Sequence, residues 1–438
     1  MTARIDGFSK LSKSDKIDWI VSNFTHDPEG FKSLIKQYWN DDTELQRIHD
    51  EFAENTISNF YLPLGIAPNF LINGKIYAIP MAVEESSVVA AASNAAKYWQ
   101  NRGGFKAVVL RTEKVGQVHF TFSGASSWLE EAFISLKPKL IQDLKPLMKN
   151  MEERGGGLLS LELRNKTSLL DNYYQLHATF ETKDAMGANF INSCLEQLAA
   201  SWEEEIDRRE YTGGDHPDTE IIMSILSNYV PDCIVRAEVS CPVNVLDEDA
   251  MDTELFARKM IQAVSIAQVE PFRAVTHNKG IMNGVDAVVL ATGNDFRAVE
   301  AGVHAYAARE GSYKGLTEAW IEDGQFSLRI DLPLALGTVG GLTRLHPLVR
   351  FSMEVLGQPS AKELMELVAV AGLAQNFAAL RSLVTTGIQQ GHMKMHLLNI
   401  LNQLGASSTE KEKVVAHFKT ATVSFNEAQQ VLEQIRRS

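Results

Sequence analysis

Residues 271–302 carry the densest set of side chains with chemical potential. Their sequence is PFRAVTHNKGIMNGVDAVVLATGNDFRAVEAG, in which basic, amide and acidic side chains are mixed with glycines and apolar residues. Polar groups in an apolar setting destabilise a fold unless they have partners. The segment therefore fits either a structural network of caps and ion pairs or an active site, and its residues alone do not name a reaction.

Lys279 and Asp295 are the charged residues of this segment with a definable use. We expect Lys279 near a helix start, where a desolvated ammonium would stabilise an oxyanion; a solvated surface lysine is the alternative. Asp295 could act beside it or simply cap a helix. A straight helix over 280–290 would be about 16 Å long and keep the two apart. A contact therefore requires the chain to turn back, for example through an extended AVVLAT segment.

Glu84 and Glu85 are the first two residues of an alanine-rich stretch, EESSVVAAASNAAKYW. The alanines favour a helix, whose start Ser86 or Ser87 can cap and whose small side chains favour a central position. Two solvated acids, stabilised by the helix dipole, would explain the pair without a function. A functional role requires one buried carboxyl with a raised pKa, so that it can donate a proton.

A histidine, His392, opens the C-terminal tail within the tripeptide GHM. His396 follows four residues later, but Met393 takes the place of the glutamate in HExxH, so a zinc peptidase is not supported. A packed or surface histidine is the ordinary interpretation. On a moving cap, His392 would be well placed to donate a proton.

Two glycine-containing segments permit a close approach to a ligand. DAMGAN (184–189) lies between a predicted strand and a predicted helix, and LGTVGG (336–341) is either a ligand-facing loop or a plain turn. Neither GxGxxG nor GxxxxGK[ST] occurs where a phosphate loop is expected. A standard Rossmann site and a P-loop are therefore not indicated.

Composition narrows the classes of function. The 438 residues carry a formal charge of −13, which argues against a general nucleic-acid binder. Cys194, Cys233 and Cys241 form neither a disulfide framework nor a zinc pattern. The N-terminus lacks an apolar signal-peptide core, and the longest apolar stretch, 367–380, is too short to span a bilayer. We expect a soluble, cytoplasmic protein that binds neither nucleic acid nor membrane.

The order of predicted elements indicates an α+β fold. Asn73-Gly74 between two apolar runs predicts a β-hairpin. Alternating apolar residues predict strands around 118–122, 159–163 and 174–180, followed by one at 220–226 or 233–239. With helices at about 126–148 and up to about 205, this order is βαββαβ, the ferredoxin-like pattern.

We therefore expect three parts. A large helix-rich domain around the alanine-rich helix comprises 1–107 and 223–385, and the ferredoxin-like cofactor domain is inserted at 108–222. Amphipathic stretches near 393–404, 410–420 and 425–436 form a C-terminal helical flap, 386–438.

Six motifs in order make the chain similar to a known family. EESSVVAAAS, DAMGAN, RAVTHNKGIMNG, GNDFRAVEAG, GLAQN and GHM together resemble hydroxymethylglutaryl-CoA reductase of the bacterial, soluble type (class II), over almost the whole chain. The resemblance implies reduction of hydroxymethylglutaryl-CoA to mevalonate by two nicotinamide hydrides, through a mevaldehyde-level intermediate and with release of CoA. It also implies a homodimer or larger homo-oligomer whose active sites lie between subunits, and no metal.

The resemblance also implies roles for particular residues. Glu85 matches the acid that protonates the aldehyde-level oxygen, Lys279 the lysine that holds the reacting oxygen, Asp295 the aspartate that tunes both, and His392 the acid for the CoA thiolate. Matched substrate positions are Ser87, Asn228, Arg273, Asn283, Gln375 and Asn376. Matched cofactor positions are Asp184, Met186, Gly187 and Asn189.

The chain departs from the family pattern at several positions. Ser58 replaces a glycine in ENTIS, and Ser86 replaces a proline in EESS. NAD-selective relatives carry an acid seven residues before the triple glycine. Met148 stands there, with Lys145 and Lys149 nearby, so we expect NADPH to be favoured over NADH. Leu398 stands where animal enzymes have a phosphorylatable serine.

Two alternatives remain from other classes of protein. A CoA-thioester acyltransferase would need a cysteine nucleophile, yet none of the three cysteines lies in a glycine-rich or histidine-paired setting. A non-catalytic paralogue would bind CoA thioesters without turning them over. The presence of all four matched polar residues argues against such decay.

Overall fold

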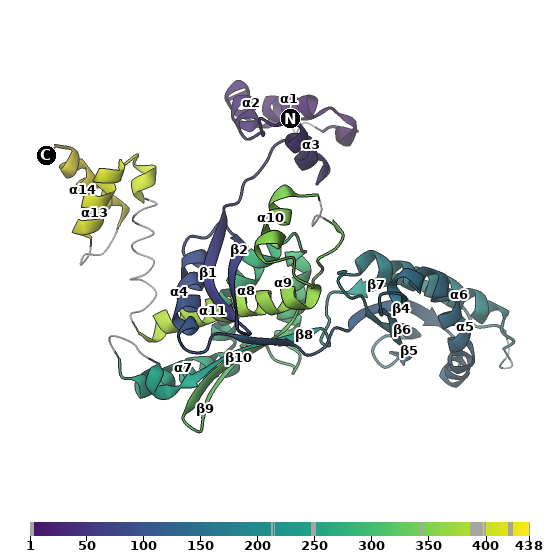
Figure 1. The fold of residues 1–438 in the computed structure, drawn as a ribbon. Helices are drawn as coiled ribbons and strands as arrows, with labels where there is room; N and C mark the ends of the chain where they lie inside the picture. The colour runs from purple at the N-terminus through teal and green to yellow at the C-terminus, as the bar shows by residue number, and fades with distance from the viewer. Residues whose placement is uncertain are drawn as a thin grey trace.

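The computed structural model describes residues 4–211, 213, 215–246, 251–341, 345–385, 397, 400–418 and 424–437. Within these ranges the chain forms one two-stranded and two four-stranded antiparallel sheets, with helices packed against them (Figure 1). The mixed α+β fold predicted from the sequence is confirmed.

Three short helices begin the chain after a 3₁₀ turn, η1 (Phe8–Lys10). They are α1 (Lys13–Phe24), α2 (Pro28–Gln37) and α3 (Thr43–Glu51). Ser12, Asp27 and Asp42 cap them by accepting backbone N–H groups, the usual function of these residue types at a helix start. These helices lie apart from the sheets, as the polar sequence predicts (Figure 1).

The predicted hairpin and alanine-rich helix both form. Strands β1 (Leu64–Ile72) and β2 (Lys75–Ala82) are joined by Asn73-Gly74, whose φ angles of 49° and 81° suit the right-handed strand twist. Helix α4 (Val88–Gln100) follows and buries Ala92, Ala95 and Ala96. It packs against β1 and against α11 (Ala361–Val384).

The four-stranded sheet of the larger domain has the order β3-β8-β10-β9. Its strands are β3 (Lys106–Val109), β8 (Ile234–Pro242), β9 (Thr317–Glu322) and β10 (Gln325–Pro333), with η2 (Val243–Val245) after β8. The helices of this domain are α7 (Thr253–Val269), α8 (Pro271–Ala291), α9 (Phe296–Ala307) and α10 (Pro347–Val355), together with α4 and α11. Residues of α8 and α11 form much of the main hydrophobic core.

Helix α11 occupies the centre together with α4. It is long and apolar enough to cross a membrane by length and composition, but 67% of its most apolar window is buried inside this chain, which is the pattern of a core helix. It crosses α8 very closely, because Gly284 faces its backbone. A Cβ at Gly284 would lie 2.4 Å from the carbonyl oxygen of Ala371, so only glycine allows this contact.

The smaller domain has the predicted βαββαβ order. Its elements are β4 (Lys114–Phe122), α5 (Ser126–Glu152), β5 (Gly157–Asn165), β6 (Tyr173–Glu181), α6 (Ala188–Arg208) and β7 (Thr219–Ser227). The sheet order is β5-β6-β4-β7, and both helices pack on one face over Phe120, Leu176 and Trp202. Its elements extend from Lys114 to Ser227, a few residues later at each end than the expected 108–222.

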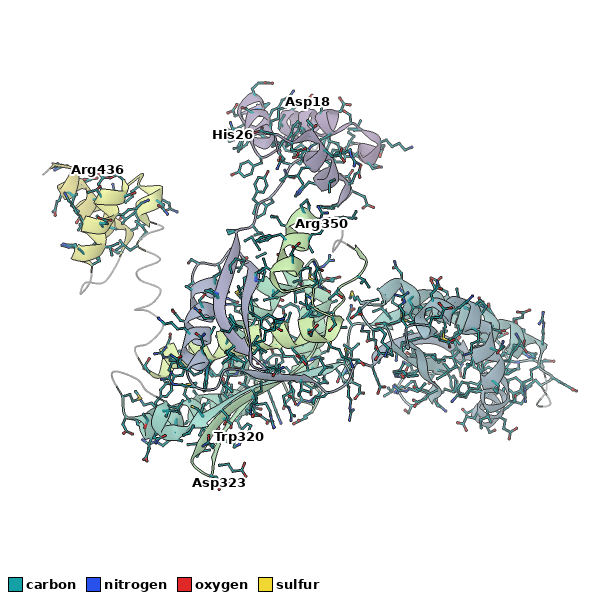
Figure 2. All side chains as sticks on the ribbon, viewed as in Figure 1. Asp18, His26, Trp320, Asp323, Arg350 and Arg436 are labelled. Carbon is teal, nitrogen blue, oxygen red and sulfur yellow. The ribbon has the colours of Figure 1, made fainter. Side chains whose placement is uncertain are left out.

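The described part of the C-terminal tail is a small helical unit. Helices α13 (Ser408–His417) and α14 (Phe425–Arg437) enclose Leu401, Val414 and Leu432 in a core of their own. Arg436, labelled in Figure 2, donates to Glu410 at 2.8 Å and ties the two helices together. Of the helix predicted at 393–404, residues 397 and 400–403 are helical, whereas 393–396, 398 and 399 lie outside the described residues.

Candidate active site

Lys279 and Glu85 meet although 194 residues separate them in the chain. Lys279 Nζ donates to Glu85 Oε2 at 2.8 Å. Lys279 is the ninth residue of α8, whereas Glu85 lies in the connection between β2 and α4. The expectation of a helix start at Lys279 is therefore wrong. The expectation of a buried ammonium also fails in the single chain, because the two side chains are 61% and 37% exposed.

Asp295 lies far from this pair in the same chain. The AVVLAT segment, one place where the chain could have turned back in an extended form, is helical, because α8 continues without a break to Ala291. From Lys279 to Ala291 the helix rises about 18 Å at about 1.5 Å per residue. The structure therefore brings together only two of the three residues expected at the reacting oxygen.

Asp295 begins α9 as its N-cap. Its Oδ1 accepts the backbone N–H groups of Arg297 and Ala298, and Arg297 Nε lies 3.1 Å from the same oxygen. Burial raises the pKa of the Asp295 carboxyl, but the hydrogen bonds and the charge of Arg297 outweigh burial, so its pKa lies below the ordinary value. Asp295 is thus held as a carboxylate at a fixed place.

Several expected substrate residues lie near Lys279 or Glu85 along the chain. Asn283 is four residues after Lys279 on α8 and Arg273 is six residues before it, so both lie within two turns. Ser87 occupies the N-cap position of α4, but its side chain makes no capping bond, contrary to expectation. Its φ of 80° is unusual for a residue with a side chain and marks a constrained position.

Gln375 and Asn376 approach from α11 and are almost completely buried. Gln375 Oε1 and Asn376 Oδ1 have no hydrogen-bond partner among the described residues, although buried polar atoms normally have one. Asn376 Nδ2 donates to His277 Nε2 on α8 at 3.2 Å. Burial and the charge of Arg273 lower the pKa of His277 to about 3, so this histidine is neutral.

The expected cofactor segment forms a second cluster, 184–189, against the 336–339 loop. Thr338 N donates to Asp184 O at 2.8 Å, and a Cβ at Gly337 would lie 2.4 Å from Met186 N. Gly337 N in turn donates to Asn294 Oδ1, next to Asp295. This second cluster therefore joins the expected cofactor segment to the start of α9.

The side chains of the cofactor segment differ in what they do. Asp184 Oδ1 accepts from Ala361 N at the start of α11, so this carboxylate has a structural partner. Gly187 has a φ of 93° and is the N-cap of α6, where no side chain caps the helix. Asn189 is exposed in the first turn of α6.

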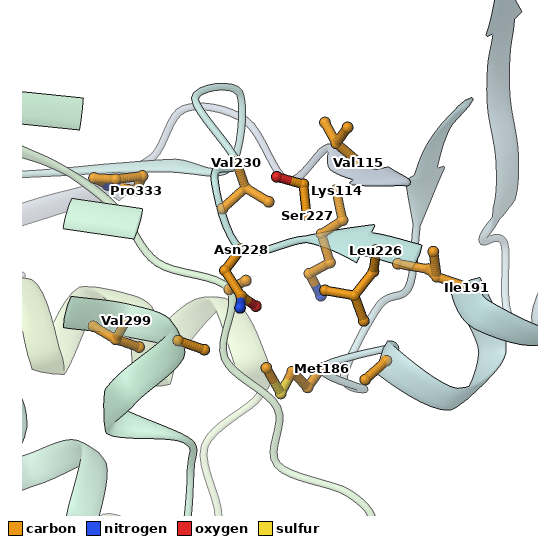
Figure 3. A pocket seen from close by; sticks show the side chains of 13 residues that line it. Lys114, Val115, Met186, Ile191, Leu226, Ser227, Asn228, Val230, Val299 and Pro333 are labelled. Carbon is orange, nitrogen blue, oxygen red and sulfur yellow. The ribbon is translucent and has the colours of Figure 1, made fainter. Parts of the chain in front are cut away.

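A small pocket lies between the two domains at this second cluster (Figure 3). Asn228 and Met186, both expected site residues, line it with Val299 of α9. Its volume is about 20 Å³, room for a water-sized group. Asn228 is therefore near Met186 and α9, and not in the cluster around Lys279.

Lys114 lines the same pocket and was missed in the sequence. Its side chain is 5% exposed, and its Nζ donates to Ala185 O at 2.8 Å and to Thr182 Oγ1. A signal was present, because Lys114 shares the alternation of the inward-facing Val118 and Phe120.

Met148, the expected ribose position, is 1% exposed and packs in the core of the smaller domain on the inner face of α5. The preference for NADPH drawn from this position stays a prediction. His392 lies outside the described residues.

Comparisons with known proteins agree with these motifs. The family model of hydroxymethylglutaryl-coenzyme A reductase matches residues 20–397. The 3-hydroxy-3-methylglutaryl-coenzyme A reductase of Archaeoglobus fulgidus is 38% identical over 441 residues, covering 100% of this chain and 95% of that protein. A probable enzyme of the same name from Borreliella burgdorferi is 35% identical, covering 99% of this chain and 97% of that protein.

A solved structure is also similar. The class II 3-hydroxy-3-methylglutaryl-CoA reductase from Streptococcus pneumoniae, bound to NADPH in open conformations, is 36% identical with a TM-score of 0.72 and covers 97% of this chain and 100% of that chain. The family model spans most of the chain, and the relatives match over nearly their whole length. The chain therefore belongs to the hydroxymethylglutaryl-coenzyme A reductase family.

Proposed function

We propose that this protein interconverts 3-hydroxy-3-methylglutaryl-CoA and mevalonate plus CoA by two successive hydride transfers, through a mevaldehyde-level intermediate. The observation that carries the proposal is the 2.8 Å hydrogen bond between Lys279 Nζ and Glu85 Oε2. It joins the HNKG and EESS motifs, which are distant in sequence, into one cation–acid pair.

The pair suits the chemistry of a thioester carbonyl. Hydride addition creates negative charge on the carbonyl oxygen, and a fixed ammonium such as that of Lys279 stabilises it. Glu85, hydrogen-bonded to Lys279, is placed to deliver a proton to the oxygen of the aldehyde-level intermediate. Arg273 and Asn283 on α8, with Ser87, Gln375 and Asn376, would bind the rest of the substrate. Gln375 Oε1 and Asn376 Oδ1 support this role, because they have no partner among the described residues and a ligand hydroxyl would satisfy them.

A second copy of the chain would complete the site. The Lys279–Glu85 pair is open to solvent in one chain, whereas an ammonium stabilises charge best where water is excluded. Asp295 and Asn228 lie in the other cluster, at the far end of α8. We propose a homodimer in which Lys279 and Glu85 of one subunit face Asp295 and Asn228 of the partner subunit.

The second cluster fits a nicotinamide cofactor, which would supply the hydrides. Because Gly187 adds no side-chain cap, the first backbone N–H groups of α6 are open to an anionic group such as a pyrophosphate. Asp184, Met186, Gly187 and Asn189 would hold the cofactor there. We propose NADPH as the preferred form, supported by the NADPH-bound Streptococcus pneumoniae relative. Parallel rate measurements with NADH and NADPH test this choice.

The leaving thiolate needs an acid near neutral pH, which suits histidine. We propose His392 for this role, supported by its place in the GHM motif at the start of the tail. The tail 386–438 would then act as a flap that closes over the substrate. We also propose a cytoplasmic location, supported by three free thiols, which suit a reducing compartment.

The cysteine-dependent acyltransferase is disfavoured by the structure. Cys194, Cys233 and Cys241 are all buried, and burial raises the pKa of each thiol to about 11. The thiolate is the nucleophilic form, so none of the three is activated for attack.

The decisive experiment follows NADPH oxidation and the release of free CoA thiol together, with hydroxymethylglutaryl-CoA as substrate. Two NADPH consumed per CoA released is expected. No NADPH use with acyl transfer supports the acyltransferase, and no CoA release supports a binding module. Lys279→Ala should abolish turnover while far-UV circular dichroism stays unchanged. Lys259→Ala, an exposed lysine on α7, is the matched control and should retain activity.

A further inference from the structure

A chain of hydrogen-bonded side chains connects α8, α9 and the loop before β9. The Asp286 carboxyl of α8 lies within hydrogen-bonding reach of the Glu300 carboxyl of α9. Glu300 Oε2 lies 2.6 Å from His304 Nε2 one turn later, and His304 Nδ1 lies 2.7 Å from the hydroxyl of Tyr313. Asp286 Oδ1 is inaccessible to solvent and accepts no hydrogen bond from the described residues.

The chain of bonds returns to α8 beside the reacting lysine. The Tyr313 hydroxyl lies within hydrogen-bonding reach of Asn278, which is completely buried and immediately precedes Lys279. Asn278 is itself fixed, because it donates to Lys314 O at 2.8 Å and accepts from Leu316 N at 3.0 Å. The network therefore fastens α9 to α8 at two places, near Lys279 and two turns further on.

The protonation states determine which carboxyl group donates the hydrogen bond and which accepts it. Two carboxyl groups can share a hydrogen bond only if one keeps its proton. Burial, and then the adjacent Glu300, raise the pKa of Asp286, whereas the bond from His304 lowers the pKa of Glu300. Asp286 therefore donates to the Glu300 carboxylate, as does His304. The charges that act on this pair are those of the two carboxyls and of His304.

We propose that Asp286, Glu300 and His304 are positioning residues for the reaction, because they hold the start of α9, and with it Asp295, in a fixed place relative to Lys279. Glu300 lies five residues after Asp295, little more than one helical turn. If Asp286 stops donating to Glu300, α9 is released on that side and Asp295 can shift. None of the three residues needs to touch substrate. This role rests on the proposed reductase function.

Two substitutions at Asp286 test the role. Asp286→Leu removes the hydrogen bond, and we expect kcat to fall by about tenfold to about a hundredfold, with KM for hydroxymethylglutaryl-CoA nearly unchanged, because a displaced reacting group slows the chemical step. Asp286→Asn keeps a donor to Glu300 without an ionisable proton. It should retain kcat near neutral pH, and it should lose less activity at alkaline pH than the wild type.

The control is Asp331→Asn, which weakens a comparable carboxylate bonded at 2.8 Å to Arg236 between β8 and β10. It should leave kcat and the pH profile unchanged. All rates are measured below the melting temperature of each variant. Wild-type kcat in Asp286→Leu, an equal loss in Asp331→Asn, or an unaltered alkaline limb in Asp286→Asn would each overturn the positioning role. Failure of the wild type to oxidise NADPH would instead reject the proposed function.

Discussion

Replacement of Lys114 by methionine should stabilise the protein and impair its activity. The Lys114 ammonium is almost fully buried, yet it forms no ion pair with a carboxylate of the described residues. Its partners are two neutral oxygens, those of Thr182 and Ala185. Burial therefore lowers the pKa of Lys114, and the electrostatic influence of Cys233, Glu181 and Asp184 only partly opposes this.

The size of the effect follows from the buried charge. An ion in a protein interior loses several kcal/mol of solvation, whereas each hydrogen bond of a charged group returns about 1.5–3 kcal/mol. Ala185 O keeps a partner in the variant, because Thr182 Oγ1 also donates to it at 2.7 Å. We expect Lys114→Met to raise the free energy of unfolding by about 1–2 kcal/mol near neutral pH.

The gain should depend on pH in a defined direction. The pKa of Lys114 is lower in the folded chain than in the unfolded chain, so between these two values the unfolded chain binds more protons. Wild-type stability therefore rises with pH through this window, by up to about 1.4 kcal/mol per pH unit, and the rise ends near the unfolded pKa of about 10.4. Lys114→Met should lack this rise and lose its advantage at the alkaline end.

The assay is urea unfolding of the wild type and Lys114→Met from about pH 6 to about pH 10. Lys106→Met, at an exposed lysine on β3, is the control and should follow the wild type. Because Lys114 lines the pocket with Met186 and Asn228, Lys114→Met should also raise the KM for NADPH. Parallel pH dependences for the wild type and Lys114→Met would refute the reasoning.

Three further outcomes can be checked. Lys279→Ala and Asp295→Asn should each be inactive alone, but mixing their subunits should restore up to about a quarter of wild-type activity. Half of the dimers would contain one subunit of each variant, and each such dimer would hold one intact site. No recovery of activity would contradict the shared site. Gly284→Ala should lower the free energy of unfolding by about 1–3 kcal/mol, because the added Cβ would overlap the backbone of α11. Urea unfolding measures this change, and unchanged stability would show that α8 and α11 separate freely. His392→Gln should impair thioester reduction more than reduction of free mevaldehyde, since no thiolate leaves in the second half-reaction, and equal losses in the two assays would count against the assignment.

Much of the fold could be predicted from local pattern. Asn73-Gly74 specified its hairpin because few residue pairs adopt two successive positive φ angles easily. The alternation of Val118, Phe120 and Phe122 specified β4, because its inward face is buried and its outward face is not.

The two possibilities left open for AVVLAT, a helix or an extended segment, have a physical origin. A short apolar run has no periodicity, so it does not distinguish a strand from a buried helix. Here the run is the last part of α8, where it packs in the main core. The burial of Met148 could have been predicted, because Leu140, Leu144, Met148 and Met151 recur at helical spacing and so share the buried face of α5.

The environment of the candidate site could not be predicted so well. Motifs identified Lys279 and Glu85, but their exposure depends on what covers α8, which a single sequence does not encode locally. Lys114 escaped notice because a lysine at an inward strand position is rare and is normally expected at the surface. The pairing of Asp286 with Glu300 depends on how α9 returns along α8 after the turn at Gly293, whose φ is 68°.

The unbroken course of α8 has a mechanical consequence. In the proposed homodimer, Lys279 near its middle serves one reaction centre, while Asp295 just beyond its end serves the other. A stiff rod about 18 Å long thus connects the two centres. If substrate binding at one centre shifts α8 along its axis, the reacting group at the other centre moves as well. The turnover rates of the two subunits would then be linked.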